Sequence, residues 1–225
     1  MTELFLVRHG QASFGAKNYD KLSPLGHQQS RWLGEYFSER QTDITQIWTG
    51  TLVRHQETAQ GIIDGTSQAL SPRVDACFNE FDFQSIGRAY LKLFPQEVLP
   101  TAATPAEFYR LLKKAMLAWS NNELDSADIP ESWADFEKRV RYSIELLQKD
   151  AGQGPVLVVS SGGAIAMLLS VVLGLNAAQV IELNMQIRNT SFSHFYFNQH
   201  NIRLSSFNNV PHLDTLERLS SITFS

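Results

Sequence analysis

The stretch ELFLVRHGQAS, residues 3–13, is the most informative segment of the sequence. It begins with an unbroken apolar run at residues 4–7, which is typical of a strand buried on both faces of a parallel sheet. The run ends abruptly at Arg8, His9 and Gly10. Ligands of open α/β sheets bind at the carboxyl ends of the strands. We therefore expect Arg8 and His9 to reach into a cleft, and Gly10 to let the backbone turn and approach a ligand closely.

The composition fits one large α/β domain with a sizeable core. Of the 225 residues, 43% are hydrophobic and 19% are charged. A net charge of −4 with scattered Lys and Arg residues argues against a nucleic-acid partner. The single cysteine, Cys77, excludes an internal disulfide and fits a reducing compartment. The longest apolar stretch, residues 164–175, is too short to cross a membrane, and the N-terminus lacks signal-peptide features, so we expect a cytoplasmic protein.

Strands alternate with helices along the chain, which is typical of a parallel sheet. A second buried strand is predicted at residues 156–159, directly before the turn Ser-Ser-Gly-Gly at residues 160–163. Two later runs, residues 191–197 and 202–207, predict a hairpin. The sequence therefore predicts a three-layer α/β sandwich, with a mostly parallel sheet flanked by helices, formed as a single domain by residues 1–225.

The segment from about residue 87 to 128 is predicted to form a helical cap over the cleft. Its clearest helix begins at residues 104–107, Thr-Pro-Ala-Glu, which combine a capping box with proline at the first helical position. Apolar positions then follow with the spacing of a core-facing stripe. They are Phe108, Leu111, Leu112, Ala115 and Trp119.

The Arg-His-Gly motif is short, and three further segments with charged or anion-binding groups give it weight. Arg54 lies at the start of a predicted helix, where the alternative is an ordinary solvated cation. Glu80 and Asp82 lie among phenylalanines, and either one can instead be an ordinary surface acid. The turn at residues 160–163 precedes a helix, whose free N–H groups and positive dipole end favour an anion.

The order of these segments resembles the histidine phosphatase superfamily, in its phosphoglycerate-mutase-like branch. The resemblance includes the Arg-His-Gly start, the stretch LSPLGHQQ and a Leu-x-Arg-x-x-x-Thr-Ala pattern at residues 52–59. It continues with the Asn-Glu segment at Glu80, the helix start ESWAD, the Ser-x-Gly-Gly turn and the closing segment NNVPHL. It spans nearly the whole chain and implies a phosphoglycerate mutase-like fold.

The resemblance implies a phosphomonoester hydrolase that forms a phosphohistidine on His9. Arg8 and Arg54 would clamp phosphoryl oxygens, because a guanidinium pairs with two oxygens at once. Glu80, with Asp82 as the alternative, would protonate the leaving oxygen, and aromatic neighbours would raise its pKa. The other implied phosphate-binding residues are Gly10, Ser13, Ser161 and Gly162. No metal or other cofactor is implied. The expected ligand is a small phosphorylated molecule or phosphate, and the sequence leaves a homodimer open.

The turn after the late strand departs from the family's pattern. The family usually has Ser-His-Gly-Gly there, and this chain has serine at the histidine position, Ser161. Among the remaining histidines, His55 directly follows Arg54. The sequence leaves open a position near the pocket, but a helix residue that faces away is the expectation. A hydroxyl at a helix N-terminus can still donate a hydrogen bond, so the predicted oxyanion site does not depend on histidine alone.

Two segments near the expected substrate also differ. The family often has threonine, tryptophan and asparagine at the positions of Ala12, Phe14 and Gly15. The usual FGxWEG after the acid is replaced by FQSIG at residues 83–87. These differences favour a phosphatase over a phosphoglycerate mutase.

Two alternatives to the enzyme were weighed against the residues. The first is a weakened or inactive phospholigand-binding or interaction protein, because Ser161 replaces the second histidine. Retention of the four residues with direct chemical roles favours the enzyme instead; they are Arg8, His9, Arg54 and Glu80. A serine hydrolase acting through Ser161 is not expected, since the nucleophile elbow requires glycine where Val159 stands.

Overall fold

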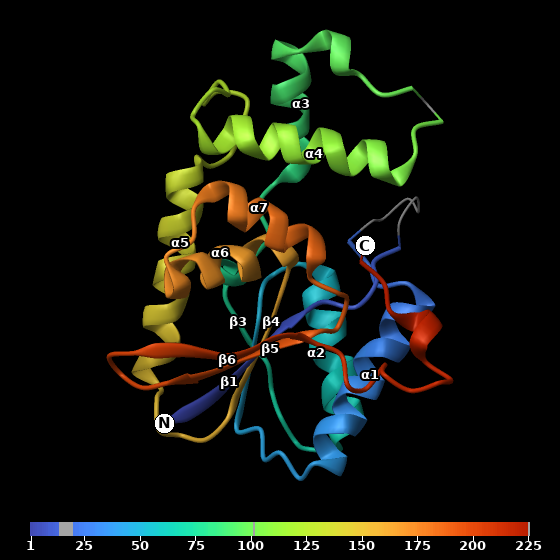
Figure 1. The fold of residues 1–225 in the computed structure, drawn as a ribbon. Helices are drawn as coiled ribbons and strands as arrows, with labels where there is room; N and C mark the ends of the chain where they lie inside the picture. Colours follow the sequence, from blue (N-terminus) through green and yellow to red (C-terminus); the bar gives the residue numbers. More distant parts are fainter. Residues whose placement is uncertain (14–19, 101, 225) are drawn as a thin grey trace.

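The computed structural model describes residues 1–13, 20–100 and 102–224, and Figure 1 shows its fold. Phe14 and Gly15, two of the departures noted above, lie outside the described residues. The strands are β1 (Thr2–Arg8), β2 (Gln46–Thr49), β3 (Arg73–Val74), β4 (Val156–Ser160), β5 (Phe192–Phe197) and β6 (Ile202–Asn209). The helices are α1 (Pro24–Glu39), α2 (Val53–Thr66), α3 (Phe83–Leu93), α4 (Pro105–Ser120), α5 (Trp133–Lys149), α6 (Gly162–Leu173) and α7 (Ala177–Gln186). Short 3-10 turns are η1 (Ala76–Phe78), η2 (Pro95–Glu97) and η3 (Leu219–Ser221).

One mixed sheet with the strand order β3-β2-β4-β1-β5-β6 forms the centre of the fold. The strands β3, β2, β4 and β1 are parallel, and the predicted hairpin, β5 and β6, adds antiparallel pairing beside β1. Arg8 pairs with Ser160 in the register of β1 and β4. The carboxyl ends of these two strands therefore meet, which brings the Arg-His-Gly segment next to the Ser-Ser-Gly-Gly turn.

Helices cover both faces of the sheet, and the predicted three-layer α/β fold is confirmed (Figure 1). Alternate residues of β1 enter two separate hydrophobic clusters. Leu4 and Leu6 pack with residues of α5 and α6, whereas Phe5 and Val7 pack with residues of α1 and α2. The unbroken apolar run is thus explained by burial on both faces.

The helices α3 and α4 stack on each other beyond α7, away from the sheet (Figure 1). Thr104 caps α4 as expected: its hydroxyl accepts from the backbone N–H of Glu107, whose carboxylate accepts from the N–H of Thr104. The apolar stripe of α4 serves two purposes. Ala115 and Trp119 are buried in the core, whereas Phe108 and Leu112, nearer the N-terminus, line a cavity.

The C-terminal residues return to the carboxyl edge of β1. The backbone N–H of Asn189 donates to the carbonyl of Thr223 at 2.9 Å, and the Gln29 amide donates to the carbonyl of Ser221 at 2.7 Å. The tail therefore contacts α1 and the segment before β5. Within the described ranges, no helix combines the length and apolar character needed to cross a membrane.

Candidate active site

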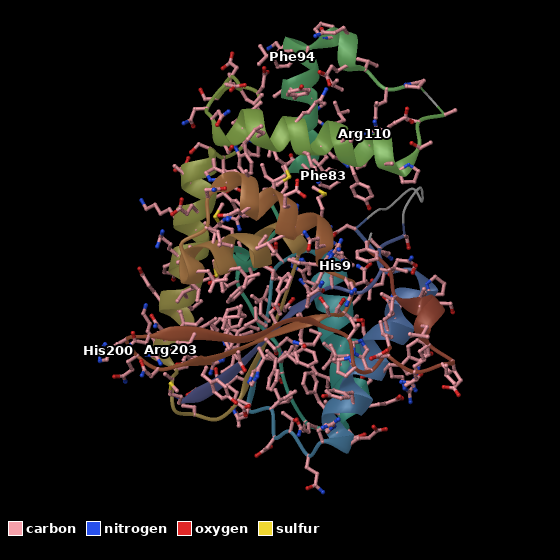
Figure 2. All side chains as sticks on the ribbon, viewed as in Figure 1. His9, Phe83, Phe94, Arg110, His200 and Arg203 are labelled. Atoms are coloured by element: carbon pink, nitrogen blue, oxygen red, sulfur yellow. The ribbon has the colours of Figure 1, made fainter. Side chains whose placement is uncertain are left out.

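A cavity of about 470 Å³ opens beyond the carboxyl end of β1 and extends toward α4. Arg8 and His9 reach it from the end of β1, Arg54 from the first turn of α2 and Glu80 from the segment after η1. These four residues are called the floor of the cavity below. In Figure 2, His9 lies between the sheet and the helical segment that carries Phe83. The structure therefore brings together the four residues that sequence considerations placed at the chemical centre.

The His9 ring is held by a hydrogen bond at each nitrogen. Its Nδ1 lies 2.7 Å from the carbonyl oxygen of Gly10, which only accepts, so Nδ1 carries the proton and donates it. Its Nε2 accepts from the Nε atom of Arg54 at 3.2 Å. Burial, then the charges of Arg54 and Arg8, hold the pKa of His9 well below its ordinary value. The imidazole is therefore neutral at neutral pH. Its lone pair is on Nε2, where it accepts the hydrogen bond from Nε of Arg54.

The two arginines are fixed by different partners. The Nη1 atom of Arg54 donates to the carboxylate of Asp20 at 2.7 Å, and this carboxylate also accepts from the N–H of Val53 at the start of α2. The Nη1 atom of Arg8 donates to the carbonyl of Ile187 and, at 2.9 Å, to that of Phe224 in the C-terminal tail. Sequence considerations missed Asp20, because an isolated acid before a predicted helix is a common surface residue.

Glu80 lies against the N-terminus of α6. Its carboxylate accepts from the backbone N–H of Gly163 at 2.9 Å and from that of Phe81 at 3.1 Å. Burial raises the pKa of Glu80 above its ordinary value, although these hydrogen bonds and the charge of Arg54 act in the opposite direction. A carboxylic acid that keeps its proton to higher pH is suited to donate that proton in a reaction.

Asp82, the alternative acid, has a structural position instead. It is the N-cap of α3 and accepts from the backbone N–H groups of Gln84 and Ser85 and from the Ser85 hydroxyl. Burial acts to raise the pKa of Asp82, but these hydrogen bonds outweigh it and lower the pKa. Asp82 does not line the cavity. Of the two acids, the geometry selects Glu80.

His55 lies inside the protein, and the expectation that it faces away was wrong. Its side chain is fully buried, and its Nε2 lies 2.6 Å from the hydroxyl oxygen of Ser161. Its ring centroid lies 5.7 Å from that of His9. Burial and the charge of Arg54 hold the pKa of His55 well below its ordinary value, so this ring is also neutral. Ser161 itself is buried behind the floor and does not line the cavity.

The expected close approach of Gly10 to a ligand is corrected by the structure. A Cβ atom at Gly10 would lie 2.5 Å from the carbonyl oxygen of Gly26 in α1, and the Gly10 N–H donates to the hydroxyl of Thr58. Gly10 is needed because two backbones pack together, and it does not line the cavity. Ser13 is also absent from the cavity lining, since its hydroxyl donates to the carbonyl of Leu22.

The N-terminus of α6 holds a protein carboxylate, which corrects the expected anion site at this turn. The N–H of Gly163 is occupied by Glu80, and a Cβ atom at Gly162 would lie 2.5 Å from the amide oxygen of Asn184. Gly162 is therefore constrained by packing against α7 and does not line the cavity. The dipole of α6 acts on Glu80 directly.

No group of three or more His, Cys, Asp or Glu side chains with the arrangement of a metal site occurs in the described part of the chain.

Comparison with known proteins agrees with this geometry. The sequence model of the histidine phosphatase superfamily, branch 1, matches residues 4–92 and 100–210. The chain belongs to this superfamily. It is 31% identical, over 204 residues, to a protein from Yersinia enterocolitica described as a probable phosphoglycerate mutase, GpmB, and the match covers 86% of this chain and 84% of that one.

Solved structures of other proteins share the fold. A phosphoglycerate mutase from Bacillus anthracis superposes with a TM-score of 0.66 at 19% identity, covering 94% of each chain. A phosphoserine phosphatase from Entamoeba histolytica, in complex with 3-phosphoglyceric acid, gives the same TM-score at 21% identity. The superposition covers 95% of this chain and 100% of that one. Relatives of this histidine phosphatase superfamily member thus include both phosphatases and mutases.

Proposed function

We propose that the protein hydrolyses phosphomonoesters through a phosphohistidine on His9. The observation that supports this most is the state of His9. Its Nδ1–H donates to the Gly10 carbonyl, so the lone pair is on Nε2, which accepts from the buried Arg54 at the cavity floor. A phosphoryl oxygen that takes over this Arg54 hydrogen bond frees the Nε2 lone pair for attack. A neutral imidazole held in one tautomer is a preorganised nucleophile.

The first step transfers the phosphoryl group to the enzyme. The Nε2 lone pair of His9 forms the N–P bond while the ester P–O bond breaks. Glu80, whose pKa is raised by burial, acts as the acid and gives its proton to the leaving oxygen, which departs as an alcohol. Arg8 and Arg54 lie at the cavity floor, where their charge stabilises the oxygens of the transferring group.

The second step returns the enzyme to its starting state. The Glu80 carboxylate accepts a proton from water, the water oxygen forms the new P–O bond, and the N–P bond to His9 breaks. Inorganic phosphate leaves and Glu80 is again a carboxylic acid. The step consumes one water for each ester and uses no oxidant, reductant or metal.

The residues that depart from the family's pattern favour hydrolysis of an ester over the mutase reaction. The FQSIG segment occurs where the family has FGxWEG, and it forms the start of α3, with Phe83 at the cavity wall. The proposal gives Ser161 an indirect role. Ser161 lies behind the floor, and its hydrogen bond to Nε2 of His55 holds that ring beside the ring of His9.

The decisive experiment is to trap the intermediate. The protein is mixed with a labelled phosphomonoester, quenched in denaturant, and tested for protein-bound label that is acid-labile and alkali-stable. We expect label on the wild type and none on His9→Ala. The matched control is His200→Ala, because His200 is exposed in the β5–β6 turn, far from His9 (Figure 2). Hydrolysis that survives in His9→Ala refutes the mechanism, and no hydrolysis by the wild type favours a phospholigand-binding protein.

A further inference from the structure

The first turns of α4 carry an apolar stripe that faces the cavity. Pro105, Phe108, Tyr109 and Leu112 line it with the spacing i, i+3, i+4 and i+7, so they form one face of the helix. The later stripe residues are buried against protein. In this part Phe108, Tyr109 and Leu112 are half-buried, Pro105 is exposed, and all four border the cavity. An apolar helix face normally packs against another apolar surface.

Other elements extend this apolar surface around the cavity. Side chains from α3, the loop before α4, α7 and the C-terminal tail join those of α4. We call this set the apolar wall; it consists of Phe83, Leu99, Phe108, Leu112, Met185 and Phe224. Five separate segments thus present apolar groups to one space directly above the floor.

Charge is distributed unequally between the floor and the wall. Among the described residues that line the cavity, charged side chains occur only at the floor: Arg8, Arg54 and Glu80. Lys92 is paired with Asp128 on the surface, and Arg88 donates to Ser85, so neither of these cap cations lines the cavity. Against the described lining residues, a second anionic group on a substrate would meet the apolar wall with no cation beside it, at a large desolvation cost.

From this arrangement we propose that the cavity binds phosphomonoesters whose alcohol part is an uncharged apolar body, such as a medium-length alkyl or aryl group. This inference rests on the proposed function, because it places the phosphoryl group at the floor. The phosphate is then held by Arg8 and Arg54, and the apolar body contacts Phe108 and Leu112 of α4. The cavity volume of about 470 Å³ lies within the usual range for small-molecule sites.

The first test measures binding without turnover, using alkylphosphonates, whose C–P bond this reaction does not cleave. Calorimetry compares ethylphosphonate with hexylphosphonate, which has four more methylene groups. Burial of each methylene is worth roughly a fourfold gain in affinity, so we expect hexylphosphonate to bind on the order of a hundredfold more tightly. Equal affinity for the two ligands overturns the inference, and so does tighter binding of 3-phosphonopropanoate, an uncleavable phosphonate with a second anionic group, than of hexylphosphonate.

Two leucine variants on the same helix locate the effect. Leu112 lines the cavity, whereas Leu117 is 45% exposed on another face of α4. We expect Leu112→Gln to lower the hexyl-to-ethyl affinity ratio by about tenfold and Leu117→Gln to leave the ratio at the wild-type value. An equal fall in both variants contradicts binding at the apolar wall.

Hydrolysis of ethyl and hexyl phosphate separates this inference from the proposed function. The two alcohols have nearly the same leaving-group acidity, so a higher kcat/KM for the hexyl ester reports contact with the wall. Preference for hexylphosphonate without any ester hydrolysis refutes the phosphatase and supports the apolar site. Hydrolysis of both esters with equal kcat/KM supports the phosphatase and overturns the apolar site.

Discussion

The Nε2 atom of His55 in α2 lies 2.6 Å from the hydroxyl oxygen of Ser161, the residue directly before α6. Both side chains are buried, and the His55 ring lies beside that of His9. The turn at Ser161 is the one that carries a histidine in the family's usual pattern. In this protein an imidazole reaches the same turn from a different helix.

This relationship predicts coupled effects of His55 and Ser161 on the rate. If the pair His55–Ser161 positions His9 from behind the floor, His55→Ala and Ser161→Ala each lower kcat by up to roughly 10²-fold, the usual cost of displacing a catalytic group by about 1 Å. The double variant should then be no slower than the slower single variant, because the two residues act as a unit. Steady-state kinetics of the three variants, with His200→Ala as the control, test this. Independent, multiplicative losses would contradict it.

Glu80→Gln should distinguish substrates by their leaving groups. An alkyl phosphate needs a proton on its leaving oxygen, so we expect kcat/KM for such an ester to fall by about 10²–10⁴-fold. An aryl phosphate with an acidic phenol should lose much less. Asp82→Asn, at the cap of α3, is the matched control and should not show this selectivity. An equal loss for both ester types would exclude Glu80 as the general acid.

The pH dependence of kcat/KM follows from the same two groups. Burial raises the pKa of Glu80, and burial with Arg54 and Arg8 lowers that of His9. A working enzyme needs neutral His9 and protonated Glu80, so activity should fall as pH rises through the raised pKa of Glu80. In Glu80→Gln this alkaline limb should disappear. Persistence of the limb would assign it to another group.

Glu80 should also reduce the stability of the folded protein at neutral pH. Its pKa is higher in the folded than in the unfolded state, so the folded state binds the proton more tightly. Stability therefore falls as pH rises from the ordinary pKa of a glutamate through the raised one. We expect Glu80→Gln to melt at a higher temperature than the wild type at neutral pH, with a difference that shrinks toward about pH 4. A difference independent of pH would contradict this linkage.

Two glycine substitutions should change stability in opposite directions. Gly10→Ala places a methyl group 2.5 Å from the backbone oxygen of Gly26, and we expect a loss of about 1–3 kcal/mol in the free energy of unfolding. Gly87 lies within α3 with no atom near its missing Cβ, so Gly87→Ala should gain about 0.5–1 kcal/mol. Denaturant titration measures both. A neutral Gly10→Ala would show that the two backbones separate easily.

The sequence alone was sufficient for the layers of the fold and for the floor of the cavity. Three features of the fold have signals within a few residues of sequence. They are the burial of alternate β1 residues on opposite faces, the cap at Thr104 and the hairpin of β5 and β6. Arg8 and His9 follow a buried strand, whose end faces the ligand edge of the sheet. Their meeting with Arg54 and Glu80 was implied by the resemblance to the histidine phosphatase superfamily.

The tertiary structure decided which partner each side chain meets. Gly10 packs on Gly26, His55 turns inward to Ser161, and Ser13 donates to Leu22, and in each case the partner belongs to another segment of the chain. The stripe of α4 shows the same limit: its spacing predicts an apolar face but not that Phe108 and Leu112 border a cavity. Helical periodicity and capping arise from neighbours in sequence, whereas the surface opposite a side chain is set by how distant elements pack together.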